Sequence, residues 1–501
     1  MNFDYIVVGT GPAGAVLAKT LSDNRKNSVL LLEAGENNDR DIPIRDSTTD
    51  LGNFFPQYFW QGVGVPQKCV NGKSFDWTTG RIAGGGSSIN GMQYVRPTPH
   101  VLRHWEGLLG PLWSPVKATR SFMELENYNG KTNNPNIHGY NGRIDIRQAP
   151  EVAPAMSKKL VSAIEQATGF KTILDYNDPQ TPLGPFNQWQ LFQKPDGQRE
   201  SASTAFLSPD IITPEGLGVG GRLLRVLFES TALRIIFNAN RDAAGIEFLK
   251  EGKFVSAYAR KKVIISAGIN SAHLLMLSGI GPSGDLRQAG IPVVFDNPNV
   301  GKCLTNHPLN NATFTVKERD IPELFRDPCA LYIGGAFLPN PLPNTSKEYR
   351  SVQLIGFLED GLLSILIIYL HPESRGSVKI QNDDPLKIVL ADEGFLVNPS
   401  DLEVIKGIYR NYIKNIAIRL SSIDQAYQLT SPTMDIIDDN AKLEDFRAYL
   451  SPPKRQSAPN SIICPRHPLW PRKHLSRSTH RIFAARLPAI SCYIPICAGF
   501  L

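Results

Sequence analysis

The sequence predicts a mixed α/β protein (α+β overall), with a parallel, doubly wound sheet near its start and an antiparallel sheet in its second half. Two patterns support this. Apolar, β-branched runs at 3–8 and 28–32 flank a stretch at 15–21 with helical spacing of apolar residues, which indicates a strand–helix–strand unit. From 309 to about 370, apolar residues alternate as they do in antiparallel strands.

A glycine-rich turn joins the first predicted strand to the helix. It consists of Gly9, Thr10, Gly11, Pro12, Ala13 and Gly14. Gly9 allows the tight turn, Gly11 lets the backbone approach a pyrophosphate, and Gly14 lets helix and strand pack closely. The helix N-terminus offers unpaired N–H groups to the phosphates.

An acidic residue completes the pattern. Glu33, followed by Ala34, ends the second strand about twenty residues beyond the glycines, where its carboxylate can accept hydrogen bonds from ribose hydroxyls. Strand, turn, helix and acid together predict a dinucleotide site and disfavour an ordinary glycine turn.

A second glycine-rich stretch runs from Gly80 to Met92 and includes Arg81, Gly85, Gly86, Ser87, Asn90 and Gly91. Consecutive glycines are costly to order and are retained where a backbone comes very close to a planar or charged group. Because apolar Ile82, Ile89 and Met92 frame the run, we predict close approach to a cofactor rather than a flexible linker.

Composition excludes several classes of function. The chain has 501 residues and a formal net charge of +6, but eight basic and no acidic residues follow position 450, so the remainder is slightly acidic. We expect no nucleic-acid partner. The longest apolar run, 362–370, is too short to span a bilayer, so we expect no membrane partner. Six scattered cysteines without metal-ligand spacing indicate free thiols in a reducing compartment and no metal site.

The two glycine stretches resemble those of the glucose–methanol–choline (GMC) oxidoreductases, flavoproteins that oxidise alcohols, sugars or choline. Gly80–Asn90, followed by Tyr94, Arg96 and Pro97, is similar to the first family signature, although Ala83 stands where a larger aliphatic residue is usual. The resemblance implies FAD as cofactor and a small-molecule alcohol as substrate. Some members attach the flavin to a histidine of this loop. Ile89 occupies that region here, so we expect non-covalent FAD.

The resemblance covers about residues 3–450. Residues 262–282 are similar to the second signature and place Ala267 and Gly268 at the cofactor, but the loop is one residue short and Ala272 replaces a proline. The family's adenine-binding strand implies a contact at Leu233. We interpret His273 as a helix-face residue. His307, after Asn306 in place of the usual aspartate, is interpreted as structural.

The family also implies two interleaved domains. We predict a discontinuous FAD-binding, Rossmann-like domain at 1–135 and 199–310, and a substrate-binding domain at 136–198 and 311–450. Residues between about 127 and 210 carry turn formers and few long periodic runs. Since the first strand begins at residue 3, we expect no secretory signal and a cytoplasmic-type location.

Residues 451–501 depart from the family. They are basic and proline-rich, and neither the family's His-Pro catalytic segment nor the later His/Asn helix start is present. We interpret this tail as disordered, and as the product of truncation or a shifted reading frame, which also removes the C-terminal part of the cofactor domain. Truncated relatives of this kind suggest a giant-virus type, with a virion location if the chain is viral.

No catalytic residue is therefore predicted, and we expect an inactive GMC scaffold. Two alternatives stay open. One is an active FAD-dependent alcohol or sugar oxidase or dehydrogenase, in which His467-Pro468 or His474 of the tail serves as the base. The other is a non-enzymatic remnant. A simple NAD dehydrogenase is disfavoured, because the Gly80–Asn90 loop has no place in it.

Overall fold

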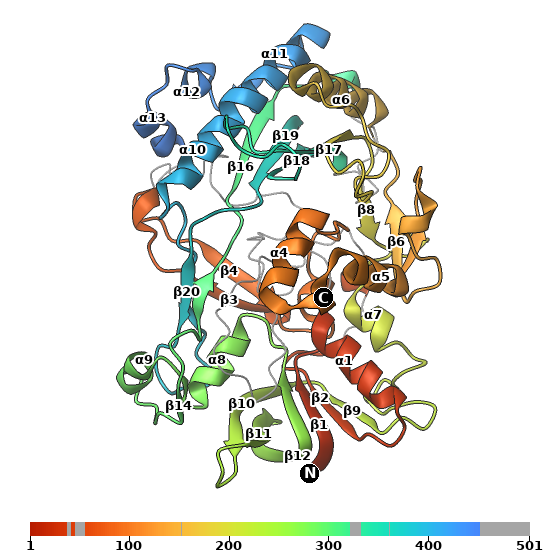
Figure 1. The fold of residues 1–501 in the computed structure, drawn as a ribbon, viewed down its shortest axis with the longest axis vertical. Helices are drawn as coiled ribbons and strands as arrows, with labels where there is room; N and C mark the ends of the chain where they lie inside the picture. The colour runs from red at the N-terminus through yellow and green to blue at the C-terminus, as the bar shows by residue number, and fades with distance from the viewer. Residues whose placement is uncertain (38–41, 46–55, 152, 321–331, 360, 451–501) are drawn as a thin grey trace.

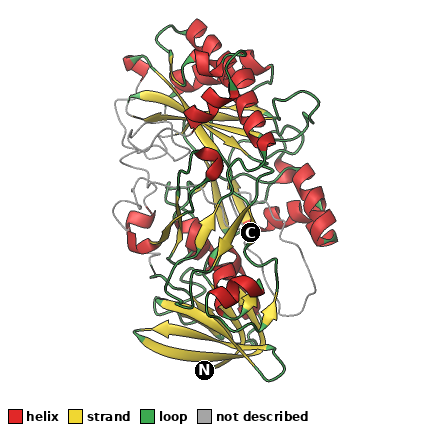
Figure 2. Ribbon diagram, turned by 90° about the vertical axis from the view of Figure 1, so that its left-hand side faces the viewer, coloured by secondary structure: helices red, strands yellow, loops and turns green. Residues whose placement is uncertain are grey.

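The computed structural model describes residues 1–37, 42–45, 56–151, 153–320, 332–359 and 361–450. The tail at 451–501, predicted to be disordered, lies outside the described residues. Figure 1 shows an elongated molecule with one large sheet near each end, and Figure 2 shows the same separation from the side.

The sheet that holds the N-terminus has the order β10-β11-β12-β1-β2-β9. Strand β1 lies between β2 and β12 and is parallel to both, and β9 is parallel to β2, whereas β10, β11 and β12 form an antiparallel meander. The bounds are β1 Asn2–Val8, β2 Val29–Leu32, β9 Leu224–Leu227, β10 Ser230–Phe237, β11 Ala243–Lys250 and β12 Lys253–Ile265. The predicted parallel strand–helix–strand unit is confirmed.

Helix α1 (Pro12–Asp23) covers one face of this sheet. Its residues Ala15 and Ala18 are fully buried, and the four residues of β2 are buried on both faces, which explains why β2 is a continuous apolar run. On the other face, α8 (Asn270–Leu277) and α9 (Ser283–Gln288) belong to the same apolar cluster as alternate residues of β1 and β2.

The second large sheet has the order β22-β16-β19-β18-β17-β7 and is antiparallel throughout. Its bounds are β7 Gly184–Phe186, β16 Leu309–Phe314, β17 Tyr332–Leu338, β18 Val352–Glu359, β19 Leu362–Tyr369 and β22 Leu429–Ser431. The predicted antiparallel sheet is therefore confirmed, and the apolar run that begins at 362 forms its buried strand β19.

The two faces of this second sheet differ in their partners. Alternate residues such as Ala312, Leu354 and Ile365 pack in one core with α6 (Pro154–Thr168), α10 (Pro399–Ile408) and α11 (Lys414–Ile423). The intervening residues, among them Ile355 and Leu366, pack toward the N-terminal sheet. The sheet thus separates an outer helical layer from the rest of the molecule (Figure 1).

Smaller elements connect the two sheets. The remaining helices of the described chain are α2 Ile42–Arg45, α4 Pro99–Leu109, α5 Pro115–Leu125, α7 Ala202–Phe206, α12 Met434–Ile437 and α13 Leu443–Leu450. Two of the smaller sheets have two strands each: β3 Phe59–Val63 with β4 Asp76–Gly80, and β13 Ile280–Gly281 with β14 Phe295–Asp296. Two have three strands each. In one, β6 Ile144–Gln148 lies between β5 Glu126–Asn129 and β8 Gln190–Phe192, and in the other, β20 Gly376–Lys379 lies between β15 Lys302–Leu304 and β21 Leu390–Asp392.

One element differs from the sequence expectation. Helix α6 spans fifteen residues within the stretch expected to hold few periodic runs. Its buried residues Met156, Leu160 and Ile164 recur at four-residue spacing, which is a helical face. Turn formers flank the helix, and Ser and Lys residues inside it interrupt the apolar spacing, so the sequence alone gives a weak helix signal. Packing of the apolar face against the antiparallel sheet stabilises the helix.

Candidate functional site

The glycine turn lies at the carboxyl end of β1. Gly9 has a left-handed backbone (φ 93°), and its N–H donates to the carbonyl of Leu32 at 2.8 Å, which ties the turn to β2. A Cβ on Gly14 would lie 1.8 Å from the Gly9 carbonyl oxygen. A Cβ on Gly11 would meet no heavy atom within 4 Å. Gly14 therefore permits the fold, while Gly11 leaves open space at the start of α1.

Glu33 follows β2 and is 5% exposed. Its Oε2 accepts hydrogen bonds from the Thr10 N–H at 3.0 Å and the Thr10 hydroxyl at 2.5 Å, and its Oε1 accepts one from the Gly35 N–H at 2.9 Å. Burial raises the pKa of Glu33, although these hydrogen bonds oppose the shift. The acid is thus fixed in place, and its Oε1 retains capacity for a further donor.

The second glycine stretch packs against the first. Thr10 also accepts a hydrogen bond from the Gly84 N–H at 3.1 Å, and a Cβ on Gly85 would lie 3.0 Å from the Cα of Gly11. Gly84 and Gly85 both have positive φ, at 84° and 55°. A Cβ on Gly86 would meet no heavy atom within 4 Å. The two glycine loops therefore contact each other directly, and Gly86 leaves open space beside that contact.

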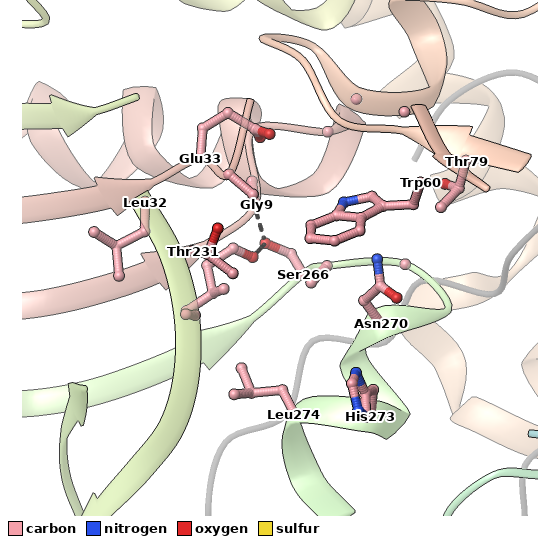
Figure 3. Close-up of a pocket in the computed structure, with 18 of the residues that line it drawn as sticks. Gly9, Leu32, Glu33, Trp60, Thr79, Thr231, Ser266, Asn270, His273 and Leu274 are labelled. Atoms are coloured by element: carbon pink, nitrogen blue, oxygen red, sulfur yellow. Dashed lines mark hydrogen bonds between the residues drawn. The ribbon is translucent and has the colours of Figure 1, made fainter. Parts of the chain in front are cut away.

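These loops line one pocket, drawn in Figure 3. The space between its atoms is about 870 Å³, including the part that opens to solvent. The predicted site residues that line it are Gly9, Gly11, Glu33, Ala34, Gly85, Gly86, Ala267 and Gly268. They meet because the carboxyl ends of the parallel strands β1, β2 and β12 share one edge of the sheet.

The other predicted residues surround this pocket without lining it. Thr10, Pro12, Ala13 and Gly14 form the glycine turn and first helical turn, and Ser87, Asn90, Gly91 and Met92 continue the second loop beyond the pocket. The Arg81 guanidinium lies 5.0 Å from the ring centre of Trp60. Leu233 is 4% exposed and its neighbours Thr231 and Ala232 line the pocket. The roles of these residues stay predictions.

Other lining residues were not among the predicted site residues. They are Val8, Leu32, Trp60, Thr79, Gly80, Ser230, Thr231, Ala232, Ser266, Asn270, Leu274, Leu277, Pro385, Lys387 and Ile388. Figure 3 shows the Trp60 indole projecting into the pocket, with Asn270 and His273 on the α8 side. Ser230 begins β10, the strand that carries Leu233. The Ser230 N–H donates to the Glu33 carbonyl oxygen at 2.7 Å.

His273 lies in α8, as expected of a helix-face residue, and it also lines the pocket. It is 8% exposed, and burial lowers its pKa to about 4. The imidazole is therefore neutral at pH 7. His307 follows β15, away from the residues that line this pocket.

The antiparallel sheet reaches the second glycine loop through two side chains. The Tyr332 hydroxyl of β17 donates to the Gly91 carbonyl at 2.8 Å. The Gln353 side-chain amide of β18 donates to the Gln93 side-chain oxygen at 2.9 Å.

Among the described residues, no helix is long and apolar enough to cross a membrane.

Comparisons with known proteins agree on one family. A family model described as GMC oxidoreductase matches residues 3–309. An alcohol dehydrogenase [acceptor] of Pseudomonas putida is 30% identical over 81% of this chain and 77% of its own length. An oxygen-dependent choline dehydrogenase of Sinorhizobium fredii is 32% identical over 61% of this chain and 53% of its own length. The chain thus spans about half the length of the choline dehydrogenases it matches.

Solved structures share the fold. A pyridoxine 4-oxidase from Mesorbium loti has a TM-score of 0.76 at 22% identity, over 89% of this chain and 85% of the other. A fungal aryl-alcohol oxidase has a TM-score of 0.74 at 19% identity, over 89% of this chain and 87% of the other. The two glycine loops, the acid after β2 and the antiparallel sheet are the features that the residue patterns predicted. The chain belongs to the GMC oxidoreductase family.

Proposed function

We propose that this chain binds FAD non-covalently in the pocket between its glycine loops. The observation that carries the proposal is the open space at Gly11 and Gly86. Both glycines line the pocket, and a Cβ added to either would meet no heavy atom within 4 Å. An anionic pyrophosphate fits there, against the N–H groups at the start of α1. Glu33 supplies fixed carboxylate oxygens for ribose hydroxyls. When bound, FAD supplies a hydride acceptor for the oxidation of a CH–OH group.

The substrate proposed for this scaffold is a small-molecule alcohol. Family membership supports it, as do relatives whose names refer to alcohol, choline and aryl-alcohol oxidation. The apolar face of the antiparallel sheet, tied to the second glycine loop through Tyr332 and Gln353, is the proposed substrate wall. Its side chains would orient the alcohol and exclude water from it.

We further propose that the chain is catalytically inactive. Alcohol oxidation needs a base that takes the hydroxyl proton, and loss of such a base costs on the order of 10²–10⁴ in rate. Of the histidines in the described residues, His273 lines the pocket, on the same helix as Asn270 and Leu274. The tail after residue 450 carries no His-Pro segment followed by the family's Gly-rich turn. Truncation or a frameshift that replaced this segment accounts for its absence from residues 451–501.

The alternative is an active FAD-dependent alcohol or sugar oxidase or dehydrogenase. The match to an alcohol dehydrogenase over 81% of this chain favours it. In that case one of the tail's histidines, His467 or His474, supplies the base.

Anaerobic spectroscopy separates these proposals. The purified chain is expected to show the visible absorption of bound flavin, and a panel of primary alcohols and sugars is expected to leave that absorption unchanged. A colourless protein that does not take up added FAD would overturn the cofactor proposal. Bleaching of the flavin at an enzyme-like rate would overturn the inactivity proposal, and His467→Ala and His474→Ala would then identify the base.

A further inference from the structure

The turn Asn90–Met92 continues the second glycine loop, and its backbone is strained. Met92 is a buried, non-glycine residue with φ 60°. Such a conformation costs of order 1–3 kcal/mol and persists only where surrounding contacts hold it. The turn begins four residues after Gly86, which lines the pocket. A strained turn at this place points to a functional requirement for its shape.

Contacts from three separate segments hold the turn. The Phe192 N–H donates to the Met92 carbonyl at 2.7 Å, and the Tyr332 hydroxyl donates to the Gly91 carbonyl at 2.8 Å. Arg199 makes the third contact. Its Nη1 donates to the Asn90 backbone carbonyl at 2.6 Å and to the Asn90 side-chain oxygen at 3.0 Å. That side-chain oxygen also accepts a hydrogen bond from the Met92 N–H at 3.0 Å. Arg199 therefore holds the Asn90 side chain in the orientation that closes the turn.

Arg199 is a buried cation whose contacts are carbonyl oxygens. It is 5% exposed, and its other acceptors are the carbonyls of Ile44 at 3.3 Å and Ser87 at 3.5 Å. Within the described part of the chain it forms no ion pair with a carboxylate. By contrast, the equally buried Arg96 pairs with Glu126. Burial lowers the pKa of Arg199 to about 10, so the guanidinium is charged at pH 7. Burying a charge without an oppositely charged partner costs free energy, unless a further group nearby compensates the charge.

We infer that Arg199 is a positioning residue for the flavin: it holds the Asn90–Met92 turn in its strained shape and places an unneutralised positive charge behind the cofactor loop. This inference rests on the FAD site proposed above. A fixed positive charge in a low-dielectric interior favours negative charge on a neighbouring group. The flavin therefore gains electrophilicity from Arg199, whether or not an alcohol is oxidised.

The test uses the full chain with bound FAD and does not depend on turnover. Arg199→Met removes the charge and keeps the length of the side chain, while Arg199→Lys keeps the charge but loses the planar fork. Arg350→Lys is the matched control. Arg350 is also 5% exposed and donates to backbone carbonyls, those of Pro182 and Arg96, but it lies outside the loop. The readouts are the dissociation constant of FAD and that of sulfite, which adds to oxidised flavin and leaves negative charge on it.

We expect Arg199→Met to weaken sulfite binding at least about tenfold and to lower the flavin reduction potential. Arg199→Lys is expected to keep sulfite binding within about threefold but to weaken FAD binding at least about fivefold, because a single ammonium cannot reproduce the fork. Arg350→Lys is expected to change neither constant by more than about twofold.

Sulfite and FAD constants for Arg199→Met within twofold of the wild-type values would overturn the inference. Should Arg199→Met fail to fold, Arg199→Lys decides: FAD affinity equal to that of Arg350→Lys overturns it, and a selective loss supports it. A wild-type chain that takes up no FAD would overturn the proposed function itself, and the inference with it. The two failures are thus distinguished by the wild-type protein alone.

Discussion

Two glycines of one motif serve different ends. Gly14 is required by the protein, because a side chain there collides with the carbonyl of Gly9. We expect Gly11 to be required by the proposed cofactor, because a Cβ there would meet no heavy atom of the protein within 4 Å. A sequence pattern cannot separate these reasons, since both positions read as glycine.

This difference predicts opposite phenotypes. Gly11→Ala is expected to leave the thermal unfolding midpoint of the apo protein within about 2 °C of wild type and to weaken FAD binding at least about tenfold. Gly14→Ala is expected to lower the free energy of unfolding by about 1–3 kcal/mol or more, because overpacking forces the backbone to shift. Calorimetry and a flavin titration measure both. Equal loss of stability in the two variants would contradict this assignment.

At the scale of elements, a buried charge network joins β5, the turn before residue 139 and the loop after α6. His138 lies between Glu126 and Asp175, with Nδ1 2.9 Å from the Glu126 carboxylate and Nε2 2.8 Å from that of Asp175. Only the imidazolium can donate from both nitrogens. Burial opposes its charge, but the hydrogen bonds to Asp175 and Glu126 raise the pKa of His138. The pKa values of the two carboxyl groups are lowered in spite of burial, chiefly through their hydrogen bonds to His138.

The pH dependence of stability follows from these directions. The His138 contribution is complete below the unfolded pKa of about 6.5 and is lost as pH rises through the higher folded value. The carboxylate contribution is present above about pH 4 and is lost as pH falls through the lower folded values. We expect His138→Gln to lower the free energy of unfolding at pH 6 by about 3–5 kcal/mol and to flatten its decline between pH 6 and 9. Urea unfolding at several pH values measures this.

A His138→Gln variant with the same pH profile as wild type would show that the network holds a neutral imidazole.

A second element-scale prediction concerns α6 and β18. A Cβ on Gly356 would lie 2.4 Å from Cδ2 of Leu160, whose side chain is 1% exposed. Gly356→Ala is expected to cost about 1–3 kcal/mol by overpacking, and Leu160→Ala about 2–5 kcal/mol by leaving a cavity. The double variant should be less destabilised than the sum of the two, because the new methyl enters the space that Leu160 vacates. Denaturant unfolding of the four proteins measures the coupling, and simple additivity would contradict the packing.

At the scale of the whole molecule, FAD is expected to stabilise the chain by binding across β1, β2, the second glycine loop and β12. Free FAD at a hundred times its dissociation constant should add about 2.7 kcal/mol to the free energy of unfolding. Thermal unfolding with increasing FAD measures the gain. AMP, which matches the adenosine part alone, is the control and should give a smaller gain at equal concentration. A midpoint independent of FAD would contradict the cofactor site.

Much of the cofactor half could be predicted from sequence because its signals are local. The strand at 3–8, the turn at Gly9 and the acid at Glu33 lie within one supersecondary unit whose spacing is set by strand and helix geometry. The second glycine loop was also predicted, because a run of glycines framed by apolar residues is costly without a partner. Apolar alternation from 309 to about 370 predicted the antiparallel sheet, and the family resemblance implied FAD.

The tertiary structure decided what distant segments bring to the same place. Trp60, Ala232, His273 and Lys387 enter the pocket from four parts of the chain, and no local pattern marks them. No local pattern predicts that Arg199 is buried, yet folding buries it against the carbonyls of Asn90 and Ser87. Local sequence thus determined the elements and the glycine turns through backbone geometry. Burial, charge and contact among residues far apart in the chain depend on how those elements pack, and only the folded molecule sets them.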